Sequence, residues 1–254
     1  MFQRVRPYFG TFVSIDAQGQ GALRAIDAAF AAIEEVGALH HPDTGIDVDR
    51  LHAARLGRRV RVHPWTHELL RLCRELNIAS AGVFDPCTPG SRGRIGDLDL
   101  GSDGTVTKRA DIALDLGGIA KGFAVDRAIE TLHAHGCAAG AVNAGGDVRV
   151  FGSEPREIWL RSASGPAHAL RLCNAAVAVS APPSERSPSG HRGFYIGSTR
   201  EQTAGRWVAV TAPAAALADG LTKCAMLCAP EAAAALLARY GARGLFEGSG
   251  SPAH

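Results

Sequence analysis

The sequence of 254 residues predicts an α/β fold of the mixed α+β kind, with a mixed sheet, one β-α-β unit and flanking helices. Segments whose apolar residues recur at helical spacing alternate along the chain with short apolar segments typical of strands. A strand, helix, strand pattern between residues 112 and 143 is long enough for a parallel strand pair with a right-handed crossover. No linker long enough to divide the chain separates these segments, so we expect one domain over residues 1–254.

The first part of the chain alternates predicted strands and helices. Phe9–Ile15 alternates apolar residues with polar or small ones, which predicts a strand. Residues 22–39 carry apolar side chains at helical spacing and predict an amphipathic helix. After a short strand at Arg59–Val62, a helix is expected from Pro64, because proline suits the first turn of a helix.

The middle of the chain contains the predicted β-α-β unit. Ile112–Leu116 is expected to form a strand, Ile119–His135 a helix and Ala139–Asn143 the second, parallel strand. Another strand, Asp147–Phe151, follows after a two-glycine turn. The remaining expected elements are strands at Glu157–Arg161, Ala176–Ser180, Trp207–Thr211 and Leu245–Phe246, a long loop at 181–205, and helices at Ala214–Cys228 and Pro230–Tyr240.

The composition limits the class of protein and of partner. The 27 Lys and Arg residues nearly balance the 25 Asp and Glu residues and form no basic run, which disfavours a nucleic-acid partner. No apolar run reaches the roughly 18 residues that a membrane span needs, and no apolar signal segment or lipobox-like cysteine opens the chain. We therefore expect a cytoplasmic protein, with its six scattered cysteines reduced. Only three of the basic residues are lysines, namely Lys108, Lys121 and Lys223.

The strongest candidate for a ligand site is residues 115–126, Asp-Leu-Gly-Gly-Ile-Ala-Lys-Gly-Phe-Ala-Val-Asp. Here a predicted strand ends on a carboxylate, two glycines turn the backbone, and a helix begins with unpaired N–H groups. Such a helix start favours anions, phosphates in particular, through these N–H groups and the helix dipole. The segment is neither a G-x-G-x-x-G nor a Walker A motif, which disfavours Rossmann and P-loop sites. The structural alternative is a plain connection whose glycines only relieve strain.

Three further segments add polar groups. Asn143–Arg149 places a second glycine-rich turn after the next predicted strand, so both turns are expected to line one crevice. Phe84-Asp85-Pro86 supplies a carboxylate on a rigid turn, and Ala218–Lys223 places Asp219 near a helix start. Taken singly, each segment is more typical of an ordinary turn or cap.

Together these segments resemble the ApbE family of flavin transferases, the FAD:protein FMN transferases. The order and spacing of the shared motifs are specific, and the resemblance covers most of the chain. The motifs are Phe-Gly-Thr-Phe at 9–12, Val-Phe-Asp-Pro at 83–86, the 115–126 segment, Val-Asn-Ala-Gly-Gly-Asp-Val-Arg at 142–149, Ala-Val-Ser at 178–180 and Ala-Asp-Gly-Leu-Thr-Lys at 218–223.

The resemblance implies a protein that binds FAD and Mg²⁺, breaks the FAD pyrophosphate, attaches FMN to a Thr or Ser hydroxyl of an acceptor flavoprotein and releases AMP. Phosphoryl-type transfer needs positioning and charge neutralisation, which a Mg²⁺ ion held by oxygen atoms supplies. It also implies Asp219 and Lys223 at the catalytic centre, and Asp219 and the carbonyl oxygen of Gly118 as metal ligands. The residues implied to contact FAD are Phe9, Val83, Phe84, Asp85, Asp115, Lys121, Gly145 and Gly146.

Two departures from the family pattern leave alternatives open. Four residues after the metal-binding Asp, the family usually carries a Thr or Asp. This chain carries Lys223 four residues after Asp219. The Lys223 ammonium would repel Mg²⁺ or pair with Asp219. The family's His-x-x-Asp-Pro-x-Thr-Gly segment has no match at 191–199, where only His191 would substitute. The alternatives to a transferase are therefore a flavin-binding protein with weakened or lost transfer, and an FAD pyrophosphatase that makes FMN and AMP.

Overall fold

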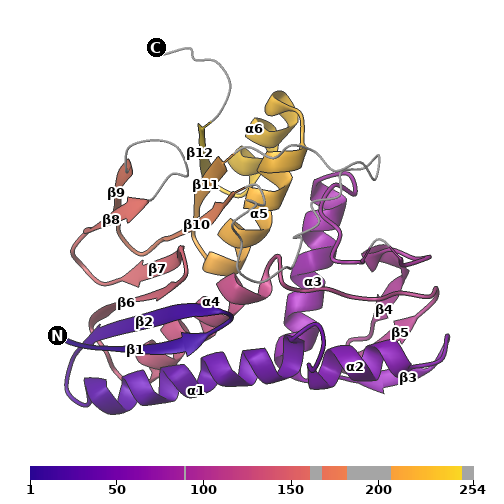
Figure 1. Cartoon of the computed structure of the whole chain (residues 1–254), viewed down its shortest axis with the longest axis horizontal. Coiled ribbons are helices and arrows are strands. Elements are labelled where there is room, and N and C mark those ends of the chain that lie inside the picture. Colours follow the sequence, from indigo (N-terminus) through magenta and orange to yellow (C-terminus); the bar gives the residue numbers. More distant parts are fainter. Residues whose placement is uncertain (89, 161–167, 182–206, 248–254) are drawn as a thin grey trace.

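A seven-stranded sheet lies on one side of the molecule (Figure 1). The structure is a computed structural model, and it describes residues 1–88, 90–160, 168–181 and 207–247. The sheet has the order β1-β2-β6-β7-β10-β11-β12, and every neighbouring pair is antiparallel. Its strands are β1 (Phe2–Tyr8), β2 (Thr11–Gln18), β6 (Ala139–Ala144), β7 (Asp147–Phe151), β10 (Ala176–Ser180), β11 (Trp207–Ala212) and β12 (Arg243–Glu247).

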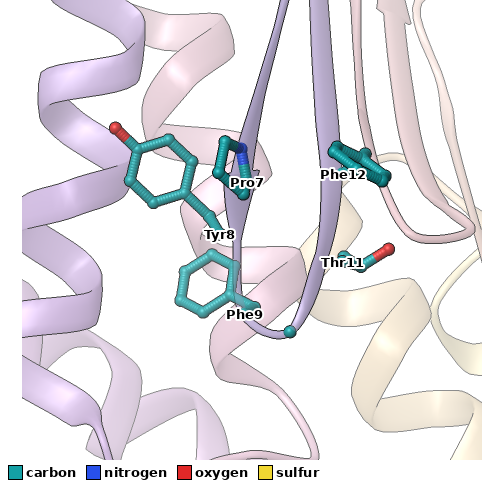
Figure 2. Close-up of a pocket in the computed structure, with 6 residues that line it drawn as sticks. Pro7, Tyr8, Phe9, Thr11 and Phe12 are labelled. Carbon is teal, nitrogen blue, oxygen red and sulfur yellow. The ribbon is translucent and has the colours of Figure 1, made fainter.

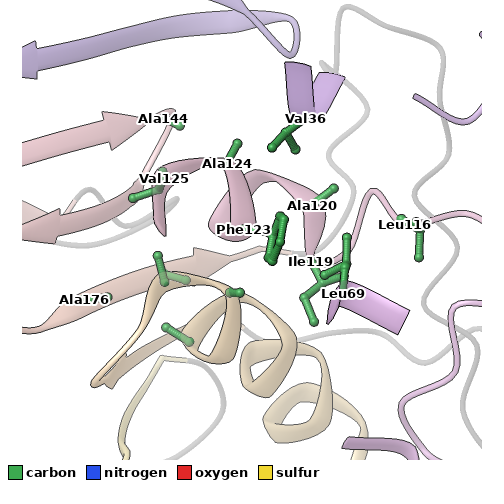
Figure 3. Packing of buried hydrophobic residues seen from close by; sticks show 14 of the residues in the cluster. Val36, Leu69, Leu116, Ile119, Ala120, Phe123, Ala124, Val125, Ala144 and Ala176 are labelled. Atoms are coloured by element: carbon green, nitrogen blue, oxygen red, sulfur yellow. The ribbon is translucent and has the colours of Figure 1, made fainter. Parts of the chain in front are cut away.

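Helices α1, α4 and α5 cover one face of this sheet, and α6 packs against α5 and β12. The inward residues of β2 are fully buried beneath the helices and alternate with more exposed ones, as a half-buried strand requires. Helix α4 packs against both α1 and α5 on this face, and Figure 3 shows Phe123 and Ala124 of α4 among buried residues of the surrounding elements. The helices are α1 (Ala22–His40), α4 (Ala120–Ala134), α5 (Ala215–Leu227) and α6 (Pro230–Arg239).

The opposite face of the sheet carries a smaller core. The hairpin of β8 (Arg156–Leu160) and β9 (His168–Leu172) buries Leu160 and Leu172 against apolar residues of β7, β10 and β11. Strand β7 is almost entirely buried, because the helices cover one of its faces and the β8–β9 hairpin covers the other. Among the described residues, no helix is long and apolar enough to cross a membrane.

A second group of elements lies beyond α3, on the side away from the large sheet (Figure 1). Its small sheet has the antiparallel order β3-β5-β4. The core that α3 shares with α1, α4 and α5 is continuous, because residues from all four helices belong to one buried cluster. The elements are α2 (Ile46–Ala53), β3 (Arg59–Arg61), α3 (Pro64–Ala79), the 3₁₀ turn η1 (Ile95–Asp97), β4 (Leu98–Leu100) and β5 (Thr105–Lys108).

The mixed α/β class is confirmed, but the strand at Ile112–Leu116 and its parallel pairing with Ala139–Asn143 are wrong. Leu114 forms only an isolated antiparallel bridge with Cys87. The Leu114 N–H donates to His52 Nε2 (2.7 Å) rather than to a strand of the large sheet. All the paired strands of the described residues are antiparallel, so the expected mixed sheet is not found. An apolar run does not reveal its pairing partner, because pairing is set by distant parts of the chain.

The strand expected at Phe9–Ile15 is only partly right. Phe9 (φ 53°) and Gly10 (φ 68°) adopt left-handed conformations and form the turn of a hairpin, so β2 begins at Thr11. The preceding strand β1 was not predicted, because its charged residues and Pro7 obscure the alternation. The other elements not predicted are α2, β4, β5 and β9, and most of the expected loop at 181–205 lies outside the described residues.

Candidate active site

The turn before α4 is held by its own side chain and by a neighbouring loop. The Asp115 carboxylate accepts a hydrogen bond from the Gly117 N–H (2.8 Å), and the Asp115 N–H donates to the Pro86 carbonyl (2.8 Å). Burial of Leu116 and Ile119 on either side of the two glycines anchors the turn in the core. The glycine pair at 117 and 118 therefore stays at the surface, directly before the first turn of α4.

Two ammonium groups and two carboxylates meet at this first turn of α4. Lys121 Nζ lies 3.0 Å from Asp147 Oδ2, and Lys223 forms an ion pair with Asp219 one helical turn earlier on α5. Both carboxylates are 1% exposed, whereas the side chains of Lys121 and Lys223 are 32% and 15% exposed. We call these four residues the charge cluster. Its negative groups are buried and its positive groups reach toward solvent.

The packing of α4 against β7 and α5 brings the cluster together. Asp147 starts β7 directly after Gly145 and Gly146, whose φ angles of 64° and 109° suit glycine and allow the tight turn between β6 and β7. Gly122, one residue after Lys121, donates its N–H to Asp219 Oδ2 (3.2 Å). The sequence expectation that the two glycine-rich turns lie together is therefore met, although the strands that precede them are not a parallel pair.

The pKa of Asp147 is raised by its surroundings. Burial, and then the negative charge of Asp219, raise the pKa of Asp147 from its ordinary value of 3.8 to about 6, although Lys121 and Lys223 oppose the shift. Its Oδ1 atom is buried without a hydrogen-bond partner among the described residues. A buried oxygen without a hydrogen-bond partner is costly in a purely structural role, so we take Asp147 as a candidate ligand-binding residue.

The predicted residues of the 83–86 segment hold a turn next to this site. Phe84 is buried in the core, while Val83 beside it is half-buried. Asp85 accepts hydrogen bonds at Oδ1 from the N–H groups of Cys87 (3.0 Å) and Ile95 (3.3 Å). Pro86 then accepts the Asp115 hydrogen bond, so the segment is attached to the turn before α4.

Phe9 lies at the tip of the β1–β2 hairpin, and the two sides of this tip face different neighbours. Figure 2 shows the Tyr8 and Phe9 rings on one side of the hairpin and Thr11 and Phe12 on the other. The half-buried Phe9 ring packs against the core, while a Cβ atom on Gly145 would lie 2.8 Å from Thr11 Cγ2. A pocket of about 520 Å³ is lined by Pro7, Tyr8, Phe9, Gly10, Thr11 and Phe12. The hairpin tip therefore adjoins the β6–β7 turn through Thr11 rather than through the Phe9 ring.

The residues around Asp219 do not fit a Mg²⁺ ion. One oxygen of Asp219 holds the Lys223 ammonium, and the other accepts the Gly122 N–H. Thr222 is fully buried, donates to the Asp219 carbonyl (2.6 Å) and is hydrogen-bonded to Ser180 (2.7 Å), so its hydroxyl is in use. A doubly charged ion about 4 Å from an ammonium would meet a repulsion of roughly 8 kcal/mol at an effective dielectric constant of about 20. Among the described residues, no three His, Cys, Asp or Glu side chains form a metal-binding group.

Asp147 was not among the residues singled out from the sequence. The signal that would have found it is its position directly after two glycines and at the start of an apolar strand. His191 and the rest of the 191–199 segment lie outside the described residues, so the structure places neither.

A model of the ApbE family matches residues 90–246 of the chain. The chain belongs to the ApbE family. The matched region includes the turn before α4, the β6–β7 turn and the segment of α5 that carries Asp219 and Lys223. All four members of the charge cluster therefore lie within the part of the chain that defines the family.

Individual relatives agree with this assignment. The FAD:protein FMN transferase of Rhodobacter capsulatus is 29% identical over 182 residues, which cover 59% of this chain and 35% of the relative. The aligned region is thus about a third of the length of that curated relative.

Two solved structures of other ApbE proteins share the fold. The flavinyl transferase ApbE of Pseudomonas stutzeri, in its apo form, has a TM-score of 0.81 and 21% identity, covering 98% of this chain and 92% of its own. The flavin transferase ApbE of Vibrio cholerae has a TM-score of 0.80 and 19% identity, covering 96% and 93%. The fold is therefore preserved across almost the whole length of these chains.

Proposed function

We propose that the chain transfers FMN from FAD to a Thr or Ser hydroxyl of an acceptor protein and releases AMP. In this reaction the hydroxyl oxygen forms a bond to the phosphorus atom on the FMN side of the pyrophosphate. The bond from that phosphorus to the bridging oxygen breaks, and the bridging oxygen leaves with AMP. The hydroxyl proton ends on the phosphate of AMP or in solvent.

The observation that carries the proposal is the charge cluster at the first turn of α4. Negative charge develops on the leaving phosphate as the pyrophosphate bond breaks, and fixed positive groups aimed at that position stabilise it. Lys121 and Lys223 are two such groups, each paired with a buried carboxylate and partly exposed to solvent. Membership of the ApbE family and the likeness to a named FMN transferase support the same reaction.

The surrounding turns supply the surfaces on which FAD would lie. The proposed contacts from the 83–85 segment and from Asp115 are linked to one another through the Pro86 carbonyl. On the other side, the backbone of Gly145 and Gly146 allows close approach of a phosphate or ribose, because neither residue has a side chain. We place Phe9 at the margin of this site. Its ring packs against the core of the protein, so it is turned away from the β6–β7 turn.

The test is an assay of the purified protein with FAD and the acceptor protein of the Rhodobacter capsulatus relative. Transfer gives a fluorescent acceptor band after denaturing electrophoresis and an equal amount of AMP. We expect Lys121→Gln to lower the rate at least about tenfold, because it removes a positive group from the leaving phosphate. The matched control is Arg24→Gln, which removes a positive charge from an exposed position on α1 and should leave the rate unchanged.

The two alternative activities give different results in the same assay. AMP and FMN without a labelled acceptor indicate an FAD pyrophosphatase. Bound FAD that stays intact indicates a flavin-binding protein without transfer. Either result, obtained with an acceptor that the relative does label, would overturn the proposed transferase function.

A further inference from the structure

Lys223 stands at the sequence position where the family usually carries an oxygen ligand of the metal ion. Its ammonium forms an ion pair with Asp219, and its aliphatic chain passes beside Gly118. A Cβ atom on Gly118 would lie 3.6 Å from Lys223 Cε, which is ordinary van der Waals contact. The side chain therefore lies against both residues that were implied to hold the metal.

The side-chain oxygen atoms of Asp219 and Thr222 are already used within the chain. Asp219 Oδ2 accepts the Gly122 N–H, which joins α5 to the first turn of α4. The Thr222 hydroxyl is fully buried and hydrogen-bonded to both Ser180 and the Asp219 carbonyl. Rotation of Lys223 away from Asp219 would therefore free one carboxylate oxygen, and the ammonium would stay close enough to repel a divalent ion bound there.

We propose that Lys223 replaces the divalent cation of this site, so that the chain binds the phosphates of FAD without Mg²⁺. This proposal rests on the proposed function, because it concerns the same substrate and the same cluster. An ammonium has three N–H donors, and one of them serves Asp219. The others are able to donate to phosphate oxygens from the partly exposed end of the side chain.

The choice of lysine supports a metal-like role. Only three of the 27 basic residues are lysines, and two of the three belong to the charge cluster. An ammonium is a compact point charge, whereas the planar guanidinium of arginine spreads its charge and needs a wider space. The lysine ammonium thus resembles a bound metal cation, as a compact point charge, more closely than the arginine guanidinium does.

The charge balance of the cluster leads to the same conclusion. Lys121 and Lys223 match Asp147 and Asp219 one to one when both carboxylates are ionised. A divalent cation bound at Asp219 would add positive charge to this balanced cluster and would meet the Lys223 ammonium that already pairs with Asp219. We therefore expect the protein to bind a divalent metal ion at this site only after Lys223 has been replaced.

The first experiment measures metal binding to the protein alone, with Mn²⁺ as the probe and electron paramagnetic resonance as the readout. We expect no saturable Mn²⁺ binding by the unchanged protein or by Arg24→Gln. Lys223→Thr should create a Mn²⁺ site that Mg²⁺ displaces, because it frees Asp219 and adds a hydroxyl oxygen. Saturable Mn²⁺ binding by the unchanged protein that Asp219→Asn abolishes would overturn the proposal.

The second experiment measures FAD affinity by flavin fluorescence, with Mg²⁺ or with EDTA. The unchanged protein should bind FAD equally in both, and Lys223→Gln should bind it at least about tenfold more weakly, which corresponds to about 1.4 kcal/mol. Lys223→Thr should be weak in EDTA and should recover with Mg²⁺. A gain of about tenfold or more on adding Mg²⁺ to the unchanged protein would contradict the proposal. Absence of FAD binding under every condition would overturn the proposed function, whereas the Mn²⁺ result would still decide the role of Lys223.

Discussion

Two buried carboxylates within the same core, Asp126 and Asp147, are used in opposite ways. Asp126 on α4 accepts hydrogen bonds from the Arg149 guanidinium (2.6 Å) and from the N–H groups of Ala215 and Ala216 (2.8 Å each). Asp147 has the ammonium of Lys121 on one oxygen, and its other oxygen lacks a hydrogen-bond partner among the described residues. Burial alone therefore does not distinguish these two carboxylates, whereas the completeness of their hydrogen bonding among the described residues does.

The difference follows from what each carboxylate faces. Asp126 meets the N-terminus of α5, where Ala214 offers no side-chain cap, so a carboxylate from another helix satisfies the first N–H groups. Asp147 faces two ammonium groups and a second carboxylate at the edge of the α4 turn. The first arrangement joins two helices, and the second belongs to the charge cluster that we propose binds the phosphates of FAD.

The largest effect is expected from Asp126→Ala. The substitution leaves Arg149 and the first N–H groups of α5 without their partner, so we expect the free energy of unfolding to fall by about 3–5 kcal/mol. Urea unfolding followed by circular dichroism measures the change. A loss smaller than about 1 kcal/mol would show that Asp126 is no more structural than Asp147.

A smaller loss is expected from Gly122→Ala, at the contact of α4 with α5. A Cβ atom at this position would lie 2.7 Å from the Ala215 carbonyl carbon, so the helices must move apart, at a cost of about 1–3 kcal/mol. The matched control is Gly118→Ala, whose Cβ atom would meet, among the described residues, only Lys223 and at ordinary contact distance. In thermal unfolding, the melting temperature of Gly122→Ala should fall below that of the unchanged protein, whereas that of Gly118→Ala should stay close to it. Equal losses of melting temperature in the two variants would contradict the close contact between α4 and α5.

Asp147→Asn should change the pH dependence of stability more than stability itself. The pKa of Asp147 is about 6 in the folded protein and 3.8 in its ordinary environment, so the folded state binds more protons between these pH values. This group therefore makes the protein less stable as pH rises from about 4 to 6, by roughly 1–3 kcal/mol, and the variant should lack this decline.

The unchanged protein must be measured alongside Asp147→Asn, because His40 makes stability depend on pH in the opposite sense. Burial lowers the pKa of His40 from 6.5 to about 4, so its contribution to stability is lost as pH falls through this window. Urea unfolding of both proteins from pH 4 to 7 isolates the Asp147 contribution as the difference between them. A constant difference across the window would contradict the raised pKa of Asp147.

The smallest effect is expected from Asp27→Asn on α1. Asp27 pairs with Arg4 (2.5 Å) and Arg6 (2.6 Å), but all three side chains are about two-fifths exposed. Solvent screens such pairs, so we expect stability to change by less than about 1 kcal/mol, and less still at high salt. A loss comparable to that of Asp126→Ala would show that pairing, rather than burial with complete hydrogen bonding, sets the contribution of a carboxylate.

Elements with a strong local pattern were predictable from the sequence, and elements defined by distant partners were not. The helices near 22–39 and from Pro64 were found because helical spacing of apolar residues is a local property. Ile112–Leu116 has the composition of a strand but lies extended against His52 and the 86–88 segment. The identity of its hydrogen-bond partners depends on residues that are far away in the sequence.

The candidate site shows the same division. The turn at 115–118 and Lys121 were visible as a motif, because glycines and a helix start follow one another in the chain. Asp147 and Asp126 gained their different roles only when α4 packed against β7 and α5. Their immediate neighbours in the sequence contain no information about which N–H groups or ammonium groups would reach them.

The sequence alone determined the family resemblance, most of the helices, and the question posed by Lys223, because each depends on residue identity and local spacing. Only the tertiary structure decided that the large sheet is antiparallel and that the Lys223 ammonium pairs with Asp219 beside Gly118. It also decided that Asp147 is buried, with one carboxylate oxygen that has no hydrogen-bond partner in the part of the chain that the structure describes. The physical reason is that burial, strand pairing and ion pairing are set by contacts between segments far apart in the chain.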